Sequence, residues 1–399
     1  MIELARLGEM ITVTKGKKPR SIYGKGPHKS VPYILIDESQ TLFTDDETVP
    51  ICFPDDILMI VDGSGSGKVF KNRYGAVGST LLRIRPISRN LLPEYLFYFL
   101  EYIQPELQMN RVGGAIPHVD KSWLIEKTIP LPPLPVQRRI AEILGSVDAV
   151  IDSLRSSLDT LVQLEGQIIE YLLSRGLEQS EHCTHPGVGR VPTRWSILPL
   201  RSILLKAQYG LSLPLMASDP GSGIPVLRMN NIRHGVLDIS DVKFLSQTDV
   251  TPEYILDDGD VLFNRTNSLD LVGKSACYDA NLILPLTFAS YLIRLKPNSK
   301  VVVGHFLTLF LNSEKGQQQI RKIITPGVSQ ANISASNLME ILVPVPPILE
   351  QTKIIGFVNS IQQLKASYSA EKDKITSLKT TLLSKFLITQ PAVQGVTHV

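Results

Sequence analysis

The sequence contains two copies of one unit. The segment Leu131 to Ile140 (LPPLPVQRRI) recurs as Val345 to Ile354 (VPPILEQTKI), at an offset of 214 residues (351 − 137, taken from the two glutamines). Other matches keep the same order along the chain, namely Leu7 with Leu200, Asp56 with Asp260 and Gly67 with Gly273. The offset grows along the chain, as insertions into surface loops would produce. An internal repeat defines the folding unit, so we predict two equivalent halves.

Each copy ends in a pattern typical of a long helix. Proline pairs suit a first helical turn and not an interior, so they mark the two starts. Apolar residues then follow spacings of three and four, the coiled-coil pattern. The first ladder is Ile140, Leu144, Val147, Ile151, Leu154, Leu158, Leu161, Glu165, Ile168 and Leu172. The second is Ile354, Phe357, Ile361, Leu364, Tyr368, Glu371, Ile375, Leu378, Leu382 and Lys385. Each helix would have about 40 residues and a length of about 60 Å. We predict that they pair with each other; the alternative is that each packs only on its own domain.

The remaining segments read as mixed domains. Short apolar runs bounded by turn residues predict strands at 31–36, 57–61, 261–263 and 291–295. The predicted fold class is therefore α+β, with two repeated mixed α/β domains and two long helices forming an antiparallel coiled coil in a pseudo-two-fold arrangement. The predicted boundaries are 1–130 (first domain), 131–176 (central helix), 177–194 (linker), 195–344 (second domain), 345–390 (C-terminal helix) and 391–399 (tail).

Composition excludes several classes of protein. The 399 residues are 43% hydrophobic and 20% charged, which excludes wholesale disorder. No apolar run approaches the length of a membrane span, and the first residues lack a signal-peptide pattern. Three widely separated cysteines predict reduced thiols and a cytoplasmic location. The net charge of +3 is too small to identify a nucleic-acid binder by itself.

Sequence motifs for catalysis or metal binding are not recognisable. The loop from Asp62 to Lys68 has Asp62 where a phosphate-binding loop needs glycine, and Val69 where it needs Ser or Thr. The segment His182 to His185 has no second Cys or His pair at a usable spacing. We therefore expect no catalytic site, no metal site and no cofactor in this chain.

Basic and amide side chains occur at matching points of the two copies. Lysine anchors phosphate, while arginine reads guanine and asparagine or glutamine reads adenine. Further candidates flank Gly113 and Gly327. The predicted DNA-contacting residues are Lys15, Lys17, Lys18, Arg20, Lys68, Lys71, Arg73, Arg111, His118, Arg228, Asn230, Asn231, Arg233, Asn264, Arg265, Asn267, Lys274, Gln330 and Asn332. For any single stretch, the alternative is an ordinary solvated face.

The repeated helix start resembles that of a known family. Pro-Pro followed by glutamine, a helix of about 40 residues and then a second copy are similar to the specificity subunit of type I restriction–modification systems. The segment from Val191 to Trp195, followed by Leu200, looks like the entry to a second target-recognition domain. The resemblance implies that partners dock at the helix starts, with candidate residues Pro132, Pro133, Gln137, Ile140, Pro346, Pro347, Gln351 and Ile354. Two departures are Val136, where the second copy has Glu350, and a first domain without a tryptophan-containing lead.

The resemblance also implies a function. It implies a non-catalytic subunit whose two target-recognition domains each read one half of an asymmetric, bipartite double-stranded DNA target. Two methyltransferase subunits and translocating restriction nuclease subunits would assemble with it, and these partners would use S-adenosylmethionine, ATP and Mg²⁺. Half-sites about one helical turn apart, roughly 34–36 Å, fit a rod of this length. The alternative from another class is a coiled-coil scaffold that recruits proteins without reading DNA.

Overall fold

The computed structural model describes residues 3–27, 29–36, 41–63, 65–112, 117–219, 221–233, 235–280, 285–327 and 330–387. Its chain divides into two compact units. One comprises Met1–Ser156 and Ser369–Val399, and the other comprises Ser157–Tyr368. Each unit therefore holds one globular domain together with a part of both long helices. Gly113, His234 and the predicted tail 391–399 lie outside the described residues.

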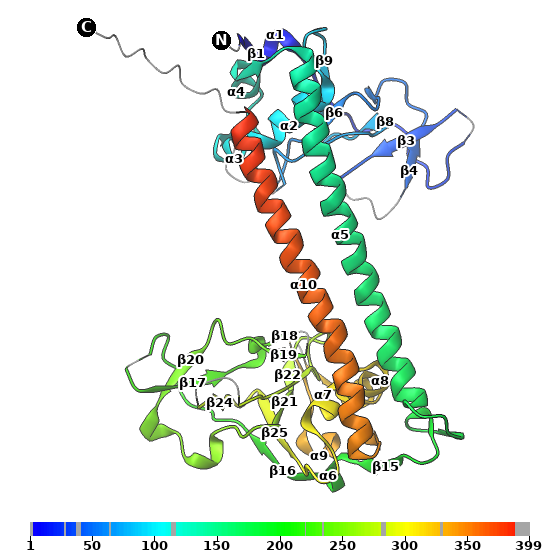
Figure 1. Ribbon diagram of the computed structural model, residues 1–399, viewed down its shortest axis with the longest axis vertical. Helices are drawn as coiled ribbons and strands as arrows, with labels where there is room; N and C mark the ends of the chain where they lie inside the picture. The colour runs from blue at the N-terminus through cyan, green and yellow to red at the C-terminus, as the bar shows by residue number, and fades with distance from the viewer. Residues whose placement is uncertain are drawn as a thin grey trace. The chain divides into compact units, whose positions relative to one another are not determined.

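The first domain mixes short strands and helices. Its strands are β1 (Glu3–Arg6), β2 (Ile11–Lys15), β3 (Val31–Ile34), β4 (Leu42–Thr44), β5 (Ile51–Cys52), β6 (Ile57–Ile60), β7 (Val69–Phe70), β8 (Gly75–Val77), β9 (Leu81–Pro86), β10 (Arg111–Val112), β11 (His118–Val119) and β12 (Thr128–Leu131). Its helices are α1 (Leu7–Met10), α2 (Pro93–Tyr102), α3 (Gln104–Met109) and α4 (Lys121–Glu126). One four-stranded sheet has the order β2-β9-β6-β7 and another has the order β4-β3-β8-β5. Helix α2 buries one side of the first sheet through fully buried Tyr95 and Tyr98 (Figure 1).

The second domain uses a similar set of elements. Its strands are β15 (Ser196–Pro199), β16 (Leu204–Tyr209), β17 (Gly223–Leu227), β18 (Ile232–Arg233), β19 (Val236–Leu237), β20 (Lys243–Ser246), β21 (Val261–Asn264), β22 (Thr266–Asn267), β23 (Ser275–Cys277), β24 (Thr287–Phe288), β25 (Leu292–Pro297), β26 (Thr325–Pro326), β27 (Ala331–Asn332) and β28 (Leu342–Val345). Its helices are α6 (Leu200–Ile203), α7 (Gly304–Asn312), α8 (Glu314–Ile323) and α9 (Ala335–Leu338), with 3₁₀ turns at Met229–Asn231, Gln247–Asp249 and Pro252–Tyr254.

The two domains share one strand order and register, which confirms the duplication. The antiparallel sheet β2-β9-β6-β7 recurs as β16-β25-β21-β23, and the pair β1·β12 recurs as β15·β28. Within the sheets, Leu58 lies opposite Arg83 and Leu262 lies opposite Arg294. The parallel pair β3·β8 recurs as β17·β24. The four predicted strand runs are confirmed as β3, β6, β21 and β25.

The long helices α5 (Leu134–Arg175) and α10 (Ile348–Leu387) are each continuous (Figure 1). In the first unit, Ile140 and Leu144 of α5 share a core with Leu383 and Leu387 of α10. In the second unit, Leu172 near the end of α5 shares a core with residues at the start of α10, Ile354 and Val358. The start of each helix thus meets the end of the other, which confirms the antiparallel pairing.

The buried face of α10 differs from the predicted ladder. Phe357, Leu364 and Leu378 are 49%, 45% and 47% exposed, so these predicted rungs are wrong. Val358 and Lys379 are buried instead, because the seam is displaced by one residue at every second rung. Lysines on this face have acidic partners: Lys365 pairs with Glu165 of α5, which explains the one polar rung of the first ladder. Hydropathy alone favoured the neighbouring Leu364 and Leu378, whereas the observed seam has Lys365 and Lys379, each paired with an acidic residue.

The linker region contains a hairpin. Strands β13 (His182–His185) and β14 (Gly189–Pro192) pair antiparallel inside the predicted linker. Lys315 of α8 donates to the Arg190 carbonyl at 2.7 Å and to that of Leu173 at 3.2 Å. The hairpin is therefore fastened to the second domain. In the part of the chain that the structure describes, no helix is long and apolar enough to cross a membrane.

Candidate nucleic-acid interface

The predicted DNA-contacting residues fall into three groups by burial. Those exposed to solvent are Lys15, Lys17, Lys18, Arg20, Lys68, Arg73, Asn230, Arg233 and Gln330. Those partly buried are Lys71, Arg111, His118, Arg228, Arg265, Asn267, Lys274 and Asn332. Two are buried, Asn231 and Asn264. Most of the predicted set can therefore reach a ligand without rearrangement, while the two buried amides have internal roles.

A charged cluster of the first domain joins three elements. Lys15 is the last residue of β2, Asp62 lies two residues after the end of β6, and His118 is the first residue of β11. An isolated β-bridge pairs His118 with Asp62. Lys15 Nζ donates to Asp62 Oδ2 at 3.2 Å, and His118 Nδ1 lies 2.9 Å from Asp62 Oδ1. Partial burial raises the pKa of the Asp62 carboxyl, but hydrogen bonds from His118 and Lys15 outweigh it and leave the pKa below its usual value. Sequence reasoning missed Asp62 because it was judged only as a failed phosphate-loop position.

Lys71 and Lys68 follow the same loop but point to different environments. Lys71 Nζ donates to the Tyr98 hydroxyl at 3.1 Å and lies 4.5 Å from the Phe97 ring centroid. Burial lowers the pKa of Lys71. Lys68, in contrast, is exposed. The preceding Gly67 has φ of +91°, a conformation that favours glycine, and it turns the chain so that Lys68 stands outside. Lys68 is thus the better phosphate ligand of the two.

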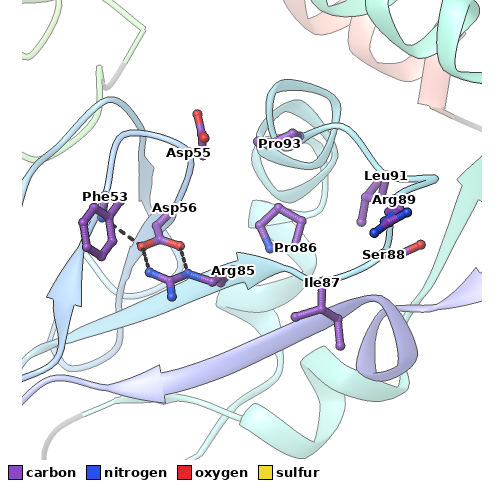
Figure 2. A pocket seen from close by; sticks show the side chains of 10 residues that line it. All are labelled: Phe53, Asp55, Asp56, Arg85, Pro86, Ile87, Ser88, Arg89, Leu91 and Pro93. Atoms are coloured by element: carbon purple, nitrogen blue, oxygen red, sulfur yellow. Dashed lines mark hydrogen bonds and ion pairs between the residues drawn. The ribbon is translucent and has the colours of Figure 1, made fainter.

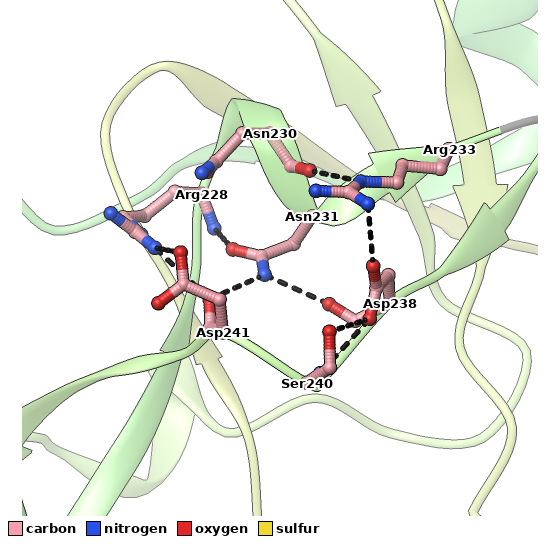
Figure 3. A network of polar contacts seen from close by, with 7 residues as sticks. All are labelled: Arg228, Asn230, Asn231, Arg233, Asp238, Ser240 and Asp241. Carbon is pink, nitrogen blue, oxygen red and sulfur yellow. Dashed lines mark hydrogen bonds and ion pairs between the residues drawn. The ribbon is translucent and has the colours of Figure 1, made fainter. Parts of the chain in front are cut away.

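The predicted Arg and Asn run of the second domain forms one network (Figure 3). Asn231 donates through Nδ2 to the carbonyls of Asp238 and Asp241, and its Oδ1 accepts from the Arg228 amide at 2.8 Å. Arg228 pairs with Asp241 at 3.1 Å, and Arg233 pairs with Asp238 at 3.2 Å. The buried Asn231 therefore shapes the loop, while Asn230 and Arg233 stand on its exposed side.

A second cluster lies where β22 meets β27. Thr266 Oγ1 is 2.6 Å from Asn332 Oδ1, and the two residues are paired in register. Arg265 lies over the ring of Tyr209, with its guanidinium carbon 4.9 Å from the centroid. The predicted residues Arg265 and Asn332 are thus brought together, along with Tyr209 and Thr266, which the sequence did not single out.

Each domain also has an arginine that holds its sheets in place. Arg83 donates to the Ile51 carbonyl and to Thr14 Oγ1, and Arg294 donates to the Ile255 carbonyl and to Gln208 Oε1. These arginines occupy the same register position. Their interactions repeat, so they belong to the framework of the fold and not to a variable surface.

An open pocket of about 460 Å³ lies beside another framework pair of the first domain (Figure 2). Arg85 binds both oxygens of buried Asp56 at 2.6 Å, and the hydrogen bonds with Asp56 raise the pKa of Arg85. The rest of the lining includes Phe53, Ile87 and two further charged residues, Asp55 and Arg89. The Asp56 carboxylate and the Arg85 guanidinium neutralise each other, so this pair offers no free charge to a ligand. Among the described residues, no three His, Cys, Asp or Glu side chains are grouped to hold a metal ion.

The glutamine of each helix start binds the same backbone groups. Gln137 accepts from the Leu92 amide at 2.9 Å and donates to the carbonyls of Asn90 and Pro132. Gln351 accepts from the Val303 amide at 2.8 Å and donates to the carbonyls of Val301 and Pro346. Leu92 and Val303 are the N-cap residues of α2 and α7. Each glutamine therefore fixes the start of a long helix to the start of a domain helix.

Most of the predicted partner-contacting residues serve this internal joint. Six are buried, namely Pro132, Gln137, Ile140, Pro346, Gln351 and Ile354. Pro133 and Pro347 are exposed. In this conformation the two exposed prolines are the members of the set that a partner could reach, and their contact with a partner stays a prediction.

Glu350 explains the departure between the two helix starts. Its carboxylate is 4% exposed and accepts from Arg194 at 2.7 Å, Trp195 Nε1 at 3.0 Å and the Leu177 amide at 2.9 Å. These donors come from the segment that leads into the second domain. The corresponding Val136 is exposed. Glu350 and the tryptophan-containing lead of the second domain therefore belong together.

Comparisons with known proteins agree in both sequence and fold. The family model described as "Type I restriction modification DNA specificity domain" matches residues 2–163 and 213–377. The chain is 25% identical to the type I restriction enzyme MjaVIII specificity subunit of Methanocaldococcus jannaschii, covering 96% of this chain and 92% of that protein. It is 24% identical to the type I restriction enzyme EcoKI specificity subunit of Escherichia coli K12, covering 83% and 70%. A crystal structure of a type I restriction–modification S subunit from M. genitalium has a TM-score of 0.57 at 17% identity, covering 98% of this chain and 97% of that one.

Proposed function

Because this chain belongs to the type I restriction–modification DNA specificity family, we propose that each of its two globular domains reads one half of an asymmetric, bipartite DNA target. Membership makes the chain a specificity subunit, whose task is DNA sequence recognition. The observation that carries the bipartite reading is the duplication: the same framework occurs twice, with matching strand order. The clusters at Asp62 and at Asn332 differ chemically, so the two half-sites should differ in sequence.

DNA binding is supported by the distribution of exposed basic groups. Lys15, Lys17, Lys18 and Arg20 follow one another at the end of β2, and all are exposed. Phosphate contacts by such groups supply affinity without sequence information. The net charge of +3 is small for a DNA-binding protein, so we propose that partner subunits supply further phosphate contacts.

We also propose that two methyltransferase subunits dock on the long helices, and that restriction subunits with translocase and nuclease activity join them. The exposed apolar side chains Leu349, Phe357 and Leu364 of α10 support a protein contact there. Aromatic side chains such as that of Phe357 are enriched at protein interfaces. In this proposal the chain itself catalyses nothing, and the partners use S-adenosylmethionine, ATP and Mg²⁺.

Methylation mapping tests the proposed function. The chain would be expressed with its host's methyltransferase subunit in a strain that lacks DNA modification, and the genomic DNA would be sequenced with detection of modified bases. We expect one gapped, two-part motif with methyladenine on opposite strands. A complex that co-purifies but leaves no motif would contradict DNA readout. The matched control is the methyltransferase subunit expressed without this chain.

A further inference from the structure

Three positions of the first copy are structurally equivalent to three positions of the second, although the residue types differ at all three. Lys15 lies opposite Leu82 at the end of β2, and Tyr209 lies opposite Ile293 at the end of β16. The next residues, Gly16 and Gly210, donate to the carbonyls of Leu81 and Leu292, which are themselves equivalent. Lys15 and Tyr209 therefore occupy one place in the repeated fold.

The same reasoning aligns the other two positions. Val61 donates to the Thr80 carbonyl and Arg265 donates to that of Tyr291, and the residues that follow them are Asp62 and Thr266. Asp62 then bridges to His118, and Thr266 pairs with Asn332. The set Lys15, Asp62 and His118 is thus the counterpart of Tyr209, Thr266 and Asn332.

In the first domain this place presents a carboxylate held by two basic groups. Lys15 and His118 are each 45% exposed and Asp62 is 21% exposed, so solvent and a ligand can reach the cluster. A lone carboxylate beside DNA is repelled by the phosphates, whereas one flanked by basic groups is not. Each Asp62 oxygen accepts one hydrogen bond and retains a further lone pair. A carboxylate in the major groove accepts from an exocyclic amino group, typically N4 of cytosine.

In the second domain the same place presents an amide. Thr266 is buried, and its hydroxyl donates to Asn332 Oδ1, while Asn332 itself is partly exposed and can be reached by a ligand. Tyr209 is 44% exposed and carries Arg265 on its ring. An asparagine side chain pairs with adenine through N6 and N7. One place in the fold therefore carries different recognition chemistry in the two copies.

We propose that Asp62 reads a cytosine amino group in the half-site of the first domain, and that Asn332, which takes the position of His118 in the equivalent set, reads an adenine in the half-site of the second. Lys15 and His118 act as positioning residues for the Asp62 carboxylate. This inference rests on the proposed function, because it assigns bases within the bipartite target.

Selection from randomised duplexes tests the assignment. The purified chain, in complex with its methyltransferase subunits, would be used to select duplexes from the random pool. The selection would be done with the wild-type chain and again with Asp62→Asn. We expect the wild type to yield a bipartite motif, and the variant to lose at least about 10-fold of its preference for one cytosine in one half-site. Asn332→Ala should instead relax one adenine in the other half-site. Asp55→Asn, which removes an exposed carboxylate of the same domain outside the cluster, is the matched control and should leave the motif unchanged.

The outcomes separate this inference from the proposed function. A wild-type complex that selects no motif would overturn both. The inference alone would be overturned by either of two results. In the first, Asp62→Asn selects the same motif as the wild type; in the second, it binds every sequence more weakly without a change of preference. If circular dichroism shows that Asp62→Asn does not fold, a double variant, Asp62→Thr with His118→Asn, replaces it. This variant places the Thr266 and Asn332 pair of the second domain in the first domain. We expect that variant to exchange the cytosine preference for adenine, and retention of cytosine would overturn the assignment.

Discussion

The indole nitrogen of Trp195 donates a hydrogen bond to the Glu350 carboxylate across 155 residues of sequence, at 3.0 Å. The same carboxylate holds Arg194 and the amide of Leu177. One buried acidic group thus joins the end of the central helix, the entry to the second domain and the start of the C-terminal helix.

Replacing Glu350 by valine, the residue of the first copy, should release this junction. Arg194 and the Trp195 nitrogen would lose their partner, so we expect a loss of about 3–5 kcal/mol in the free energy of unfolding. Trypsin cleavage after Arg190 and Arg194 should become faster. Limited proteolysis with Trp195 fluorescence measures both effects, with Val136→Ala as the control at the equivalent position. Equal cleavage rates for the two variants would contradict the junction.

Gln137→Ala and Gln351→Ala should have similar costs, because each removes hydrogen bonds to three equivalent backbone groups. The bonds to the Pro132 and Pro346 carbonyls are fully buried, and leaving one buried backbone group unpaired costs about 1–3 kcal/mol, so we expect a loss of about 1–3 kcal/mol for each variant. Urea unfolding can follow each copy separately, since Trp123 lies in the first domain and Trp195 in the second. Gln163→Ala, on an exposed position of α5, is the control. A loss below about 0.5 kcal/mol would show that the glutamines are not joints.

Lys379→Met should loosen the end of α10. Lys379 Nζ lies 2.6 Å from both Glu101 and Asp148, and its removal takes away the lysine that is ion-paired with both carboxylates. We expect faster amide hydrogen exchange from residue 379 to 387. The exposed Lys385→Met is the control, and adding Asp148→Asn should partly restore protection. Unchanged exchange in Lys379→Met would argue that apolar packing alone holds the helix end.

Lys68→Ala and Arg228→Ala should affect DNA binding differently. Lys68 is exposed, so its loss should weaken binding to all duplexes and flatten the slope of log K against log salt by about 0.9. Arg228 is tied to Asp241, and its loss should relax one position of one half-site. Fluorescence anisotropy between about 50 and 200 mM salt measures both effects. Over this range the affinity of a full protein–DNA interface falls by about 10³-fold. The exposed Lys300→Ala is the charge control; wild-type behaviour of both variants would refute the contact map.

Thiol reactivity should separate the three cysteines. Cys183 is exposed, whereas Cys52 and Cys277 are buried, and burial raises the pKa of Cys52 to about 12. A disulfide-exchange reagent at about pH 8 should modify one thiol in the native chain and three in urea. The raised pKa also predicts that stability falls as the pH rises from about 8.5 towards 12, because only the unfolded chain then releases these protons. Reaction of Cys52 without unfolding would contradict its burial.

The sequence was sufficient to predict the duplication, the long helices and four strands, because offsets and apolar periods are local signals. It could not place the seam of α10, where Lys365 and Lys379 replace leucines by pairing with acids distant in sequence. The role of Gln137 was also out of reach, since its partners lie 45 and 47 residues away. Asp62 and Thr266 could not be matched, because they share no chemistry and only the backbone hydrogen bonds align them.

The equivalence of Lys15, Asp62 and His118 with Tyr209, Thr266 and Asn332 has a consequence for how such a protein evolves. Asp62 forms hydrogen bonds with Lys15 and His118, whereas the arginines and glutamines of the framework bond to other residues. A codon change at 62 or 118 therefore leaves the joints intact. New target sequences become accessible through single, structurally inexpensive changes, while the joints between helices and domains stay in place.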